Sequence, residues 1–461
     1  MGIEYLGLSS INGPLVILEG VQDAFFDEIV EFTVDGKTKK IGRIIGLYED
    51  KAVIQVFEGT ENMSLDNTRT KLTGHPMEVS LAPDMLGRTF NGIGKPIDGL
   101  GPLITDVKRD VNGLPLNPVR RKYPRNYIRT GISAIDGLTT LIRGQKLPIF
   151  SGNGLPHDQL AAQIVKQASL GDGSDEPFAV VFGAMGVKHD VADFFQKTFE
   201  ESGVADHVCM FLNLANDPVV ERLITPKVAL TAAEYLAFDC NMHILVILTD
   251  MTSFAEAMRE VSSSKGEIPS RKGYPGYLYS ELATLYERAG IIEGAEGSVT
   301  QLPILTMPND DITHPIPDLT GYITEGQIVL DRNLNGQSIY PPISVLPSLS
   351  RLMKDGIGEG YTREDHQDLA NQLFSAYAKV GEARNLASVI GEDELSPIDK
   401  KYLEFGKEFE ERYIGQGSEE NRSMIETLDL GWELLKILPR EELDRIDTKI
   451  IDKYLPKKQE S

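Results

Sequence analysis

Hydrophobic and polar positions over about the first 70 residues alternate in short runs that predict β-strands. The runs are rich in β-branched residues and are separated by turn residues. They are GPLVILEG (13–20), EIVEFTV (28–34), IGRIIGLY (41–48) and KAVIQVFEG (51–59). Asp35 and Gly36 form an Asp-Gly signal for a hairpin turn between the second and third runs. Short strands this close together predict a small barrel or sandwich.

From about residue 145 to 335, continuous apolar runs alternate with helical patterns. The apolar runs are KLPIFS (146–151), FAVVFG (178–183), VCMFLN (208–213), HILVILTD (243–250) and LPILTM (302–307). Helical patterns such as HDQLAAQIVKQASL (157–170) fall between them. Strands that are apolar on both faces and alternate with helices predict a doubly wound, mostly parallel α/β sheet.

Beyond about residue 360 the strand pattern stops, and three amphipathic segments predict a helical domain. They are 363–380, 398–414 and 427–439. A segment rich in Pro, Arg and Lys, 102–128, is expected to run extended over a surface. The predicted domains are therefore a β-barrel (1–73), an α/β domain (74–350) that includes this connecting segment, and a helical domain (351–461).

Composition narrows the classes of partner. A chain of 461 residues is too long to fold around one hydrophobic core of ordinary size. Its formal net charge is −23. A field of that sign repels nucleic acid and anionic membrane surfaces, so nucleic acid is not expected as a partner. No apolar run approaches the roughly 20 residues that span a bilayer, and no secretory signal is visible. Cys209 and Cys240 are expected to be buried thiols in a reducing cytosol, and no metal site is predicted.

The stretch SGNGLPHDQ (151–159) has the length and place of a phosphate-binding loop, between an apolar run and a helical pattern. A working loop reads GxxxxGK followed by Ser or Thr, and its backbone N–H groups, Lys and hydroxyl hold phosphates and Mg²⁺. Every one of those positions is altered here. The residues of this degenerate loop are Ser151, Gly152, Asn153, Gly154, Pro156, His157 and Asp158.

Three of these residues oppose phosphate binding. Pro156 removes an N–H donor, and His157 is mostly neutral at pH 7. Asp158 places an anion beside the polyphosphate, and two unit charges about 4 Å apart repel by about 4 kcal/mol near a surface. That exceeds a few hydrogen bonds of about 1 kcal/mol each. A simple strand-to-helix turn with an Asp at the helix start is the alternative interpretation, and both predict weak or no ATP binding.

Long motifs around this loop resemble one family. They are TGISAIDGLTTLIRGQKLPIFSGNG (130–154), HILVILTDMTSFAEAMREVS (243–262), RKGYPGYLYSELATLYERAG (271–290) and HPIPDLTGYITEGQIVL (314–330). Together they resemble the regulatory, non-catalytic head subunits of V-type and archaeal A-type rotary ATPases, over nearly the whole chain. The resemblance implies an N-terminal β-barrel, a central RecA-like α/β domain and a C-terminal helical domain.

The resemblance also implies partners and a location. Three such regulatory subunits would alternate with three catalytic subunits in a ring-shaped head around a central rotor shaft, held by a peripheral stalk. ATP or ADP with Mg²⁺ would lie at the interface with the catalytic subunit, and none would bind tightly to this chain alone. The complex would sit at the cytoplasmic face of a membrane and couple ATP hydrolysis or synthesis to H⁺ or Na⁺ transport.

One further motif differs from the catalytic relatives, and one position is retained. Where those carry a GER motif with the glutamate that positions water, this chain has Gly186, Val187 and Lys188. Val187 cannot accept a proton, although an apolar residue after a strand is also ordinary by itself. Asp250 stands at the Walker B position, and we expect it to cap the helix at 252–262 rather than to hold Mg²⁺.

PPISVLPSLSRLM (341–353) resembles the family's α/β signature, with Ser344 where Asp, Asn or His is usual. Arg351 stands where the family's arginine reaches ATP on the neighbouring catalytic subunit. A trans arginine finger contributes roughly 10³ to 10⁵ in rate, about 4 to 7 kcal/mol of barrier. A surface ion pair is the alternative interpretation of Arg351.

GEDELSPIDKK (391–401) resembles the acidic segment that faces the rotor in this superfamily. Glu392, Asp393 and Glu394 would then touch a basic shaft, and a solvated charge run before Pro397 is the alternative. Three other functions compete with the main interpretation. They are a self-contained hexameric ATPase resembling export motors, an RNA translocase resembling the termination factor Rho, and a purely structural or cytoskeleton-binding role.

Overall fold

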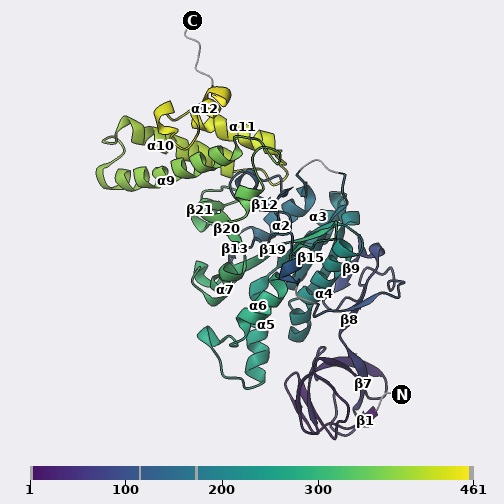
Figure 1. The fold of residues 1–461 in the computed structure, drawn as a ribbon. Coiled ribbons are helices and arrows are strands. Elements are labelled where there is room, and N and C mark those ends of the chain that lie inside the picture. Colours follow the sequence, from purple (N-terminus) through teal and green to yellow (C-terminus); the bar gives the residue numbers. More distant parts are fainter. Residues whose placement is uncertain (1–3, 114–115, 172–174, 456–461) are drawn as a thin grey trace. The chain divides into compact units, whose positions relative to one another are not determined.

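The computed structural model describes residues 4–113, 116–171 and 175–455 (Figure 1). The chain divides into two compact units, one of Met1–Asn117 with Ala179–Arg288 and one of Pro118–Phe178 with Ala289–Ser461. The predicted α/β region therefore contributes strands to both units. Each unit is described by itself below.

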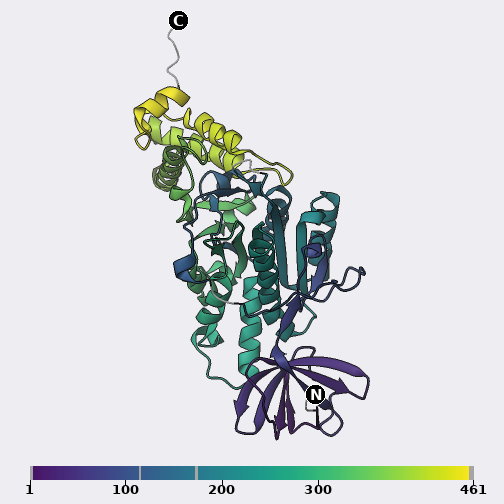
Figure 2. The same ribbon diagram turned by 45° about the vertical axis from the view of Figure 1, so that its right-hand side comes forward.

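The first unit begins with a curled seven-stranded sheet, drawn in purple in Figure 2. Its strand order is β1-β7-β4-β5-β6-β3-β2. The strands are β1 (Glu4–Leu6), β2 (Ser10–Asn12), β3 (Leu15–Glu19), β4 (Glu28–Val34), β5 (Thr38–Tyr48), β6 (Lys51–Val56) and β7 (Arg69–Pro76). Asp35 and Gly36 join β4 to β5 with φ of 50° and 70°, as a type I′ hairpin turn requires. The predicted hairpin is confirmed.

The two faces of this sheet are chemically different because side chains alternate along a strand. Ile44 of β5 and Ile54 of β6 are paired in register and fully buried in the barrel core. Their neighbours Arg43 and Gln55 are also paired and belong to the opposite face. The outer face of β5 and β6 therefore carries polar side chains at this point.

The rest of the first unit is α/β. Its strands are β8 (Glu78–Ser80), β9 (Thr89–Asn91), β10 (Lys108–Asp110), β15 (Phe178–Val187), β16 (Val208–Leu214) and β17 (His243–Thr249). Within it β15 pairs parallel with β16, and β16 parallel with β9. The helices are α3 (His189–Glu201), α4 (Val219–Phe238), α5 (Met251–Ser264) and α6 (Leu278–Tyr286). The β15 and β17 strands are almost entirely buried, which explains their continuous apolar sequences.

The second unit contains the strands that carry the degenerate loop. They are β11 (Tyr127–Arg129), β12 (Leu141–Ile142), β13 (Ile149–Gly152), β14 (Ser169–Leu170), β18 (Gly290–Ile291), β19 (Ser298–Met307), β20 (Gly326–Leu330) and β21 (Ile343–Ser350). Its α/β helices are α1 (Ser133–Asp136), α2 (His157–Gln167), α7 (Pro315–Ile323) and α8 (Arg332–Gly336). The β13 strand pairs parallel with both β19 and β20, while β21 runs antiparallel to β20. The predicted, mostly parallel pattern is confirmed within each unit.

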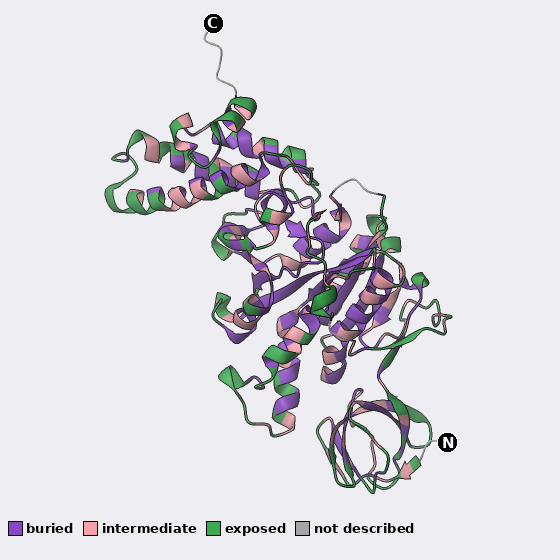
Figure 3. Ribbon diagram, viewed as in Figure 1, coloured by how far each residue is buried: buried purple, intermediate pink, exposed green. Residues whose placement is uncertain are grey.

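The helices after residue 360 also belong to the second unit. They are α9 (His366–Ile390), α10 (Pro397–Glu408), α11 (Met424–Leu435) and α12 (Thr448–Tyr454), and a π-helical segment at Phe409–Ile414 continues α10. Their facing sides are buried, as Figure 3 shows by its purple stripes. Trp432 lies in this core and donates from Nε1 to Asp365 Oδ2 at 2.6 Å. The predicted helical character of the chain beyond residue 360 is confirmed.

Two predictions need correction. Cys240 is half-buried rather than buried, because it lies just beyond the end of α4, whereas Cys209 is buried as expected. The connecting segment 102–128 is mostly exposed but not wholly extended, since it contains a short 3₁₀-helix at Pro118–Arg120. It also buries Val111 and Tyr127, and positions 114–115 lie outside the described residues. Among the described residues no helix has the length and apolarity to cross a bilayer, and no metal-binding cluster of His, Cys, Asp or Glu occurs.

Candidate functional site

The degenerate loop follows the carboxyl end of β13 and leads directly into α2. The loop turns through Gly154, whose φ is +79°, and Leu155 donates its N–H to the carbonyl oxygen of Gly152 at 3.1 Å. Carboxyl ends of parallel strands are where α/β sheets bind ligands. The strand-loop-helix placement predicted from the sequence is confirmed.

The side chain at the lysine position turns back into the loop. His157 Nδ1 forms a hydrogen bond with Ser151 Oγ at 2.9 Å, and its Nε2 lies 3.7 Å from Asp158 Oδ1. Asp158 sits in the first turn of α2, where a carboxylate suits the helix dipole. The imidazole thus forms a hydrogen bond with the loop through Nδ1, and its Nε2 lies near the Asp158 carboxylate.

An ion pair between residues that follow β19 and β20 lies against the loop. Arg332 binds Asp310 through Nε–Oδ2 at 2.6 Å and Nη2–Oδ1 at 2.9 Å, and Nη2 also donates to Asn153 O at 2.9 Å. A Cβ atom built on Gly152 would lie 2.1 Å from Asp310 Oδ1. The Arg332 guanidinium lowers the pKa of Asp310, so this carboxylate stays ionised beside the loop.

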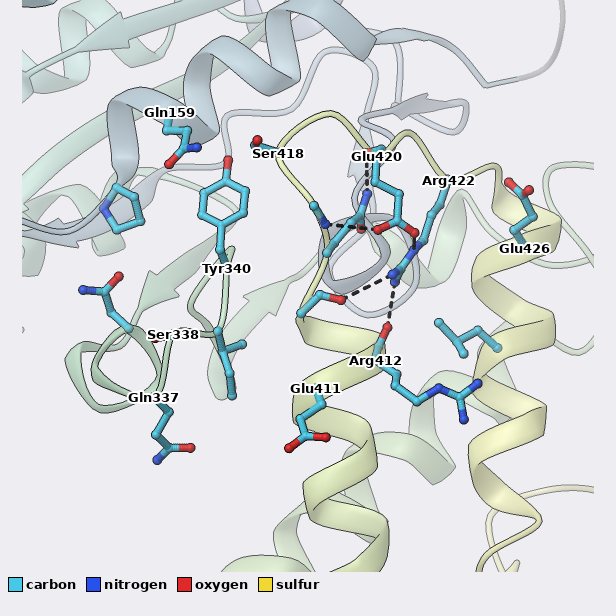
Figure 4. A pocket seen from close by; sticks show the side chains of 17 residues that line it. Gln159, Gln337, Ser338, Tyr340, Glu411, Arg412, Ser418, Glu420, Arg422 and Glu426 are labelled. Carbon is cyan, nitrogen blue, oxygen red and sulfur yellow. Dashed lines mark hydrogen bonds and ion pairs between the residues drawn. The ribbon is translucent and has the colours of Figure 1, made fainter.

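A cavity of about 1000 Å³ opens beside the start of α2, within the second unit (Figure 4). Tyr340 stands in its wall and donates from its hydroxyl to Gln163 Oε1 at 2.7 Å. Gln416 donates its backbone N–H to Tyr340 O at 2.6 Å. Burial, with the Glu419 carboxylate as a smaller cause, raises the pKa of Tyr340. On the side of Tyr340, the wall of the cavity is therefore formed by neutral aromatic and amide groups.

The arginines that line this cavity are engaged by carboxylates and carbonyls. Arg422 donates from Nε to Glu420 Oε1 at 2.6 Å and from Nη1 to Arg412 O at 2.9 Å, as the dashed lines in Figure 4 mark. Arg412 Nη2 in turn donates to Glu433 Oε1 at 2.7 Å. A polyphosphate entering here would have to compete with these carboxylates for the arginines.

Arg351 follows β21 directly and is exposed. Its backbone N–H donates to Glu325 O at 2.9 Å, and the preceding Ser350 Oγ donates to Thr140 O at 2.9 Å. The backbone under Arg351 is therefore fixed. Within the described part of the chain its guanidinium makes no hydrogen bond or ion pair, which leaves all five donors available to a partner. Ser344, at the departure from the family signature, is paired with Val329 in the sheet.

The other two positions lie in the first unit. Asp250 is the N-cap of α5, and its Oδ1 accepts from Thr252 N at 2.8 Å, so the predicted capping role is confirmed. Val187 ends β15 and is 9% exposed, Gly186 before it has a φ of 67°, and Lys188 is the N-cap residue of α3. Val187 is thus an apolar side chain at the edge of a core.

The acidic run lies between α9 and α10, after Gly391, whose φ is 91°. Glu392, Asp393 and Glu394 are all exposed, and Lys400 Nζ donates to Asp393 O at 2.9 Å. The turn between the two helices therefore presents three carboxylates to the solvent.

Sequence reasoning did not find Asp310, Arg332 or Tyr340. Asp310 and Arg332 come just after β19 and β20, the two parallel neighbours of β13. Because residues after the carboxyl ends of adjacent parallel strands meet, the strand pattern could have pointed to both. Nothing in the local sequence announces the contact of Tyr340 with Gln163, which is 177 positions away.

Three family descriptions match the chain in order. They are "ATP synthase alpha/beta family, beta-barrel domain" over 8–74, "ATP synthase alpha/beta family, nucleotide-binding domain" over 131–350, and "C-terminal domain of V and A type ATP synthase" over 355–455. These matches confirm the predicted fold class of β-barrel, nucleotide-binding-type α/β domain and helical domain.

Close relatives have the same extent as this chain. It is 64% identical to the V-type ATP synthase beta chain 2 of Clostridium tetani, over 98% of each chain. It is also 64% identical to the V-type ATP synthase beta chain of Halothermothrix orenii, over 98% of this chain and 97% of the relative. Among solved structures, the ATP synthase subunit NeqB from Nanoarcheaum equitans matches with a TM-score of 0.73 and 40% identity, over 92% of this chain and 98% of that one.

Proposed function

The chain belongs to the ATP synthase alpha/beta family, and within it we propose that it is the non-catalytic, regulatory head subunit of a V/A-type rotary ATPase. In this role it alternates with the catalytic subunit in a head of three catalytic and three regulatory subunits. It supplies Arg351 in trans to ATP held by the catalytic subunit. The complex couples ATP hydrolysis or synthesis to transport of H⁺ or Na⁺.

The observation that supports the proposal most strongly is the exposure of the Arg351 side chain. Its side chain is exposed on a fixed backbone and makes no hydrogen bond or ion pair among the described residues. Transfer of a phosphoryl group spreads negative charge over equatorial oxygens, and a planar guanidinium donates to two of them at once. Lysine would keep the charge and lose the two-point geometry.

The degenerate loop of this chain also supports a non-catalytic role. Three features oppose a bound Mg²⁺-polyphosphate: His157 is held by Ser151, Asp158 adds a negative charge, and Asp310 stands over Gly152. Asp250 Oδ1 is engaged in capping α5. ATP or ADP with Mg²⁺ therefore binds at the interface with the catalytic subunit, and this chain alone holds none tightly. The degenerate loop keeps the shape that lets the ring close.

The proposal extends to the other parts of the complex. The exposed carboxylates of Glu392, Asp393 and Glu394 meet the central rotor shaft, and the peripheral stalk holds the head. The chain is cytoplasmic, lies at the membrane's cytoplasmic face and meets the membrane only through the complex. Nucleic acid is not a partner, in keeping with the net charge of −23.

A reconstitution tests this role. ATP hydrolysis is measured for this chain alone, for its catalytic partner alone and for the mixture, with and without RNA. We expect hydrolysis in the mixture only and no effect of RNA. Hydrolysis by this chain alone would favour the self-contained ATPase, and stimulation by RNA would favour the Rho-like translocase.

A further inference from the structure

A second cavity, of about 360 Å³, lies wholly within the first unit. Its walls come from the outer face of β5 and β6 and from helices α4, α5 and α6. Apolar side chains form part of the wall: Phe26, Ile45, Leu223, Phe254, Met258 and Val261. The remaining lining residues are mostly charged or amide side chains.

Two hydrogen-bond donors of the sheet are buried there without a partner. Arg43 and Gln55 are opposite each other in the pairing of β5 with β6. The Nε of Arg43 and the Nε2 of Gln55 are both buried and make no hydrogen bond within the described chain. Gln55 is only 1% exposed. Buried donors are nearly always satisfied in folded proteins, so these two indicate a missing acceptor.

Two lysines from the helices line the same cavity. Burial lowers the pKa of Lys227 and of Lys265. The charges of Glu281 and Glu267 offset part of this effect, and the positive charge of Arg43 adds to it. Neither carboxylate is at hydrogen-bond distance, and Lys227 Nζ donates to Asn112 Oδ1 at 3.3 Å. Lys227 Nζ lies 3.8 Å from Glu281 Oε2, and Lys265 Nζ lies 3.9 Å from Glu267 Oε1.

The third cation is similarly placed. Arg43 Nη1 lies 3.6 Å from Asp27 Oδ1, and its Nη2 reaches Gln55 Oε1 only at 3.4 Å. Each cation thus has a carboxylate at ion-pair distance but none at the roughly 2.7–2.9 Å of a charge-assisted hydrogen bond. This spacing leaves donor capacity on three cationic side chains around one cavity.

We propose that this cavity is a binding site for a small oxyanion, in which Arg43 and Gln55 bind the anion from the sheet and Lys227 and Lys265 from the helices. Phosphate and carboxylate groups share the required chemistry of several acceptor oxygens on one centre. The volume exceeds that of an inorganic ion, and the apolar wall suits the carbon part of a small organic acid or phosphate ester. The residues of this site are distant in the sequence from the degenerate loop and from Arg351. The proposed oxyanion site therefore does not depend on the proposed function.

Binding to the full-length chain tests the site. Isothermal titration calorimetry with inorganic phosphate and, separately, with acetate is run at constant ionic strength balanced with chloride. We expect saturable binding with one site per chain for at least one of the two anions. The stronger of the two identifies the group that the cavity prefers.

Variants assign any binding to this cavity. Gln55→Glu, which is nearly isosteric, and Arg43→Gln should each weaken anion binding at least tenfold. If either of these sheet variants misfolds, Lys265→Met tests the same cavity from the helices and should weaken binding by as much. Arg69→Gln is the matched control, since Arg69 lies in β7 of the same sheet with 59% of its side chain exposed. Unchanged affinity in these cavity variants, or no saturable binding of either anion, would overturn the proposal.

Discussion

Arg332 holds Asp310 through two parallel hydrogen bonds, and the same guanidinium binds the backbone of the degenerate loop at Asn153. This ion pair engages the Arg332 guanidinium beside the loop and holds the Asp310 carboxylate close to Gly152. In a working phosphate loop the positive charge is directed at the ligand instead. The contacts around the loop therefore oppose phosphate binding in the same direction as its sequence, in keeping with the proposed absence of tight nucleotide binding.

Removing that carboxylate should partly reopen the loop to anions. Asp310→Ala frees the Arg332 guanidinium and deletes a negative charge, so we expect the affinity of the isolated chain for Mg-ATP to rise about tenfold, equivalent to about 1.4 kcal/mol. A titration with a fluorescent ATP analogue measures this. Asp190→Ala, which removes an exposed carboxylate from the first turn of α3, is the control and should change nothing.

Restoring the loop's own charges tests the second obstacle. In His157→Lys/Asp158→Thr the missing cation returns and the repelling anion goes. The Asp158 side chain is 33% exposed, so solvent screens part of its charge. We still expect affinity for Mg-ATP to rise by about tenfold or more. Equal affinities of the variant and the native chain would show that Pro156 and the backbone, rather than charge, exclude nucleotide.

A buried histidine in the second unit makes stability depend on pH. His366 donates from Nε2 to Gly137 O at 3.0 Å and accepts from Thr362 Oγ1 at 3.0 Å through Nδ1. Burial lowers its pKa to about 4, from 6.5. Because the folded chain resists protonation, this stability is present above pH 6.5 and is lost as pH falls toward 4. The loss is about 3 kcal/mol.

The single tryptophan of the chain, Trp432, reports on this region through its fluorescence during urea unfolding. The difference in unfolding free energy between native chain and His366→Gln should grow between pH 4 and 6.5. Burial raises the pKa of Asp136, next to Gly137, to about 6. The stability that this protonated carboxyl contributes to the folded chain is therefore lost as pH rises, which opposes the trend of His366 equally in both proteins. His75→Gln, at an exposed histidine, should follow the native curve. A difference that stays constant with pH would contradict the assignment.

Charge reversal at the turn between α9 and α10 tests the rotor contact. With Glu392, Asp393 and Glu394 all changed to Lys, we expect lower torque or weaker coupling in single-molecule rotation of the complex, with unchanged affinity for ATP. The reason is that, in the proposed assembly, the three exposed carboxylates face the rotor shaft rather than the nucleotide. The matched control reverses Glu441, an exposed residue elsewhere in the helical region. Unaltered rotation would count against the contact.

Local sequence patterns predicted most of the strands and helices, but few of the contacts around the degenerate loop. The β13, β15, β16, β17 and β19 strands were predictable because buried parallel strands are continuously apolar. The Asp250 cap was predictable since its acceptor and donor are two residues apart. The pair of Arg332 with Asp310 was missed because it depends on the register of three strands, which no local pattern sets. The two unpartnered donors of Arg43 and Gln55 were missed for the same reason.

The central claim is that Arg351 acts on ATP bound by another polypeptide of the complex. The most direct measurement is the rate of ATP hydrolysis by the complex assembled from this chain and its catalytic partner, carrying Arg351→Ala, with Arg351→Lys beside it. Arg445→Ala is the control, at an exposed arginine in the helical region. We predict intact assembly, a loss of about 10³-fold or more for Ala, a similar loss for Lys, and no loss for the control. Turnover near the native rate in the Arg351→Ala complex would contradict the account.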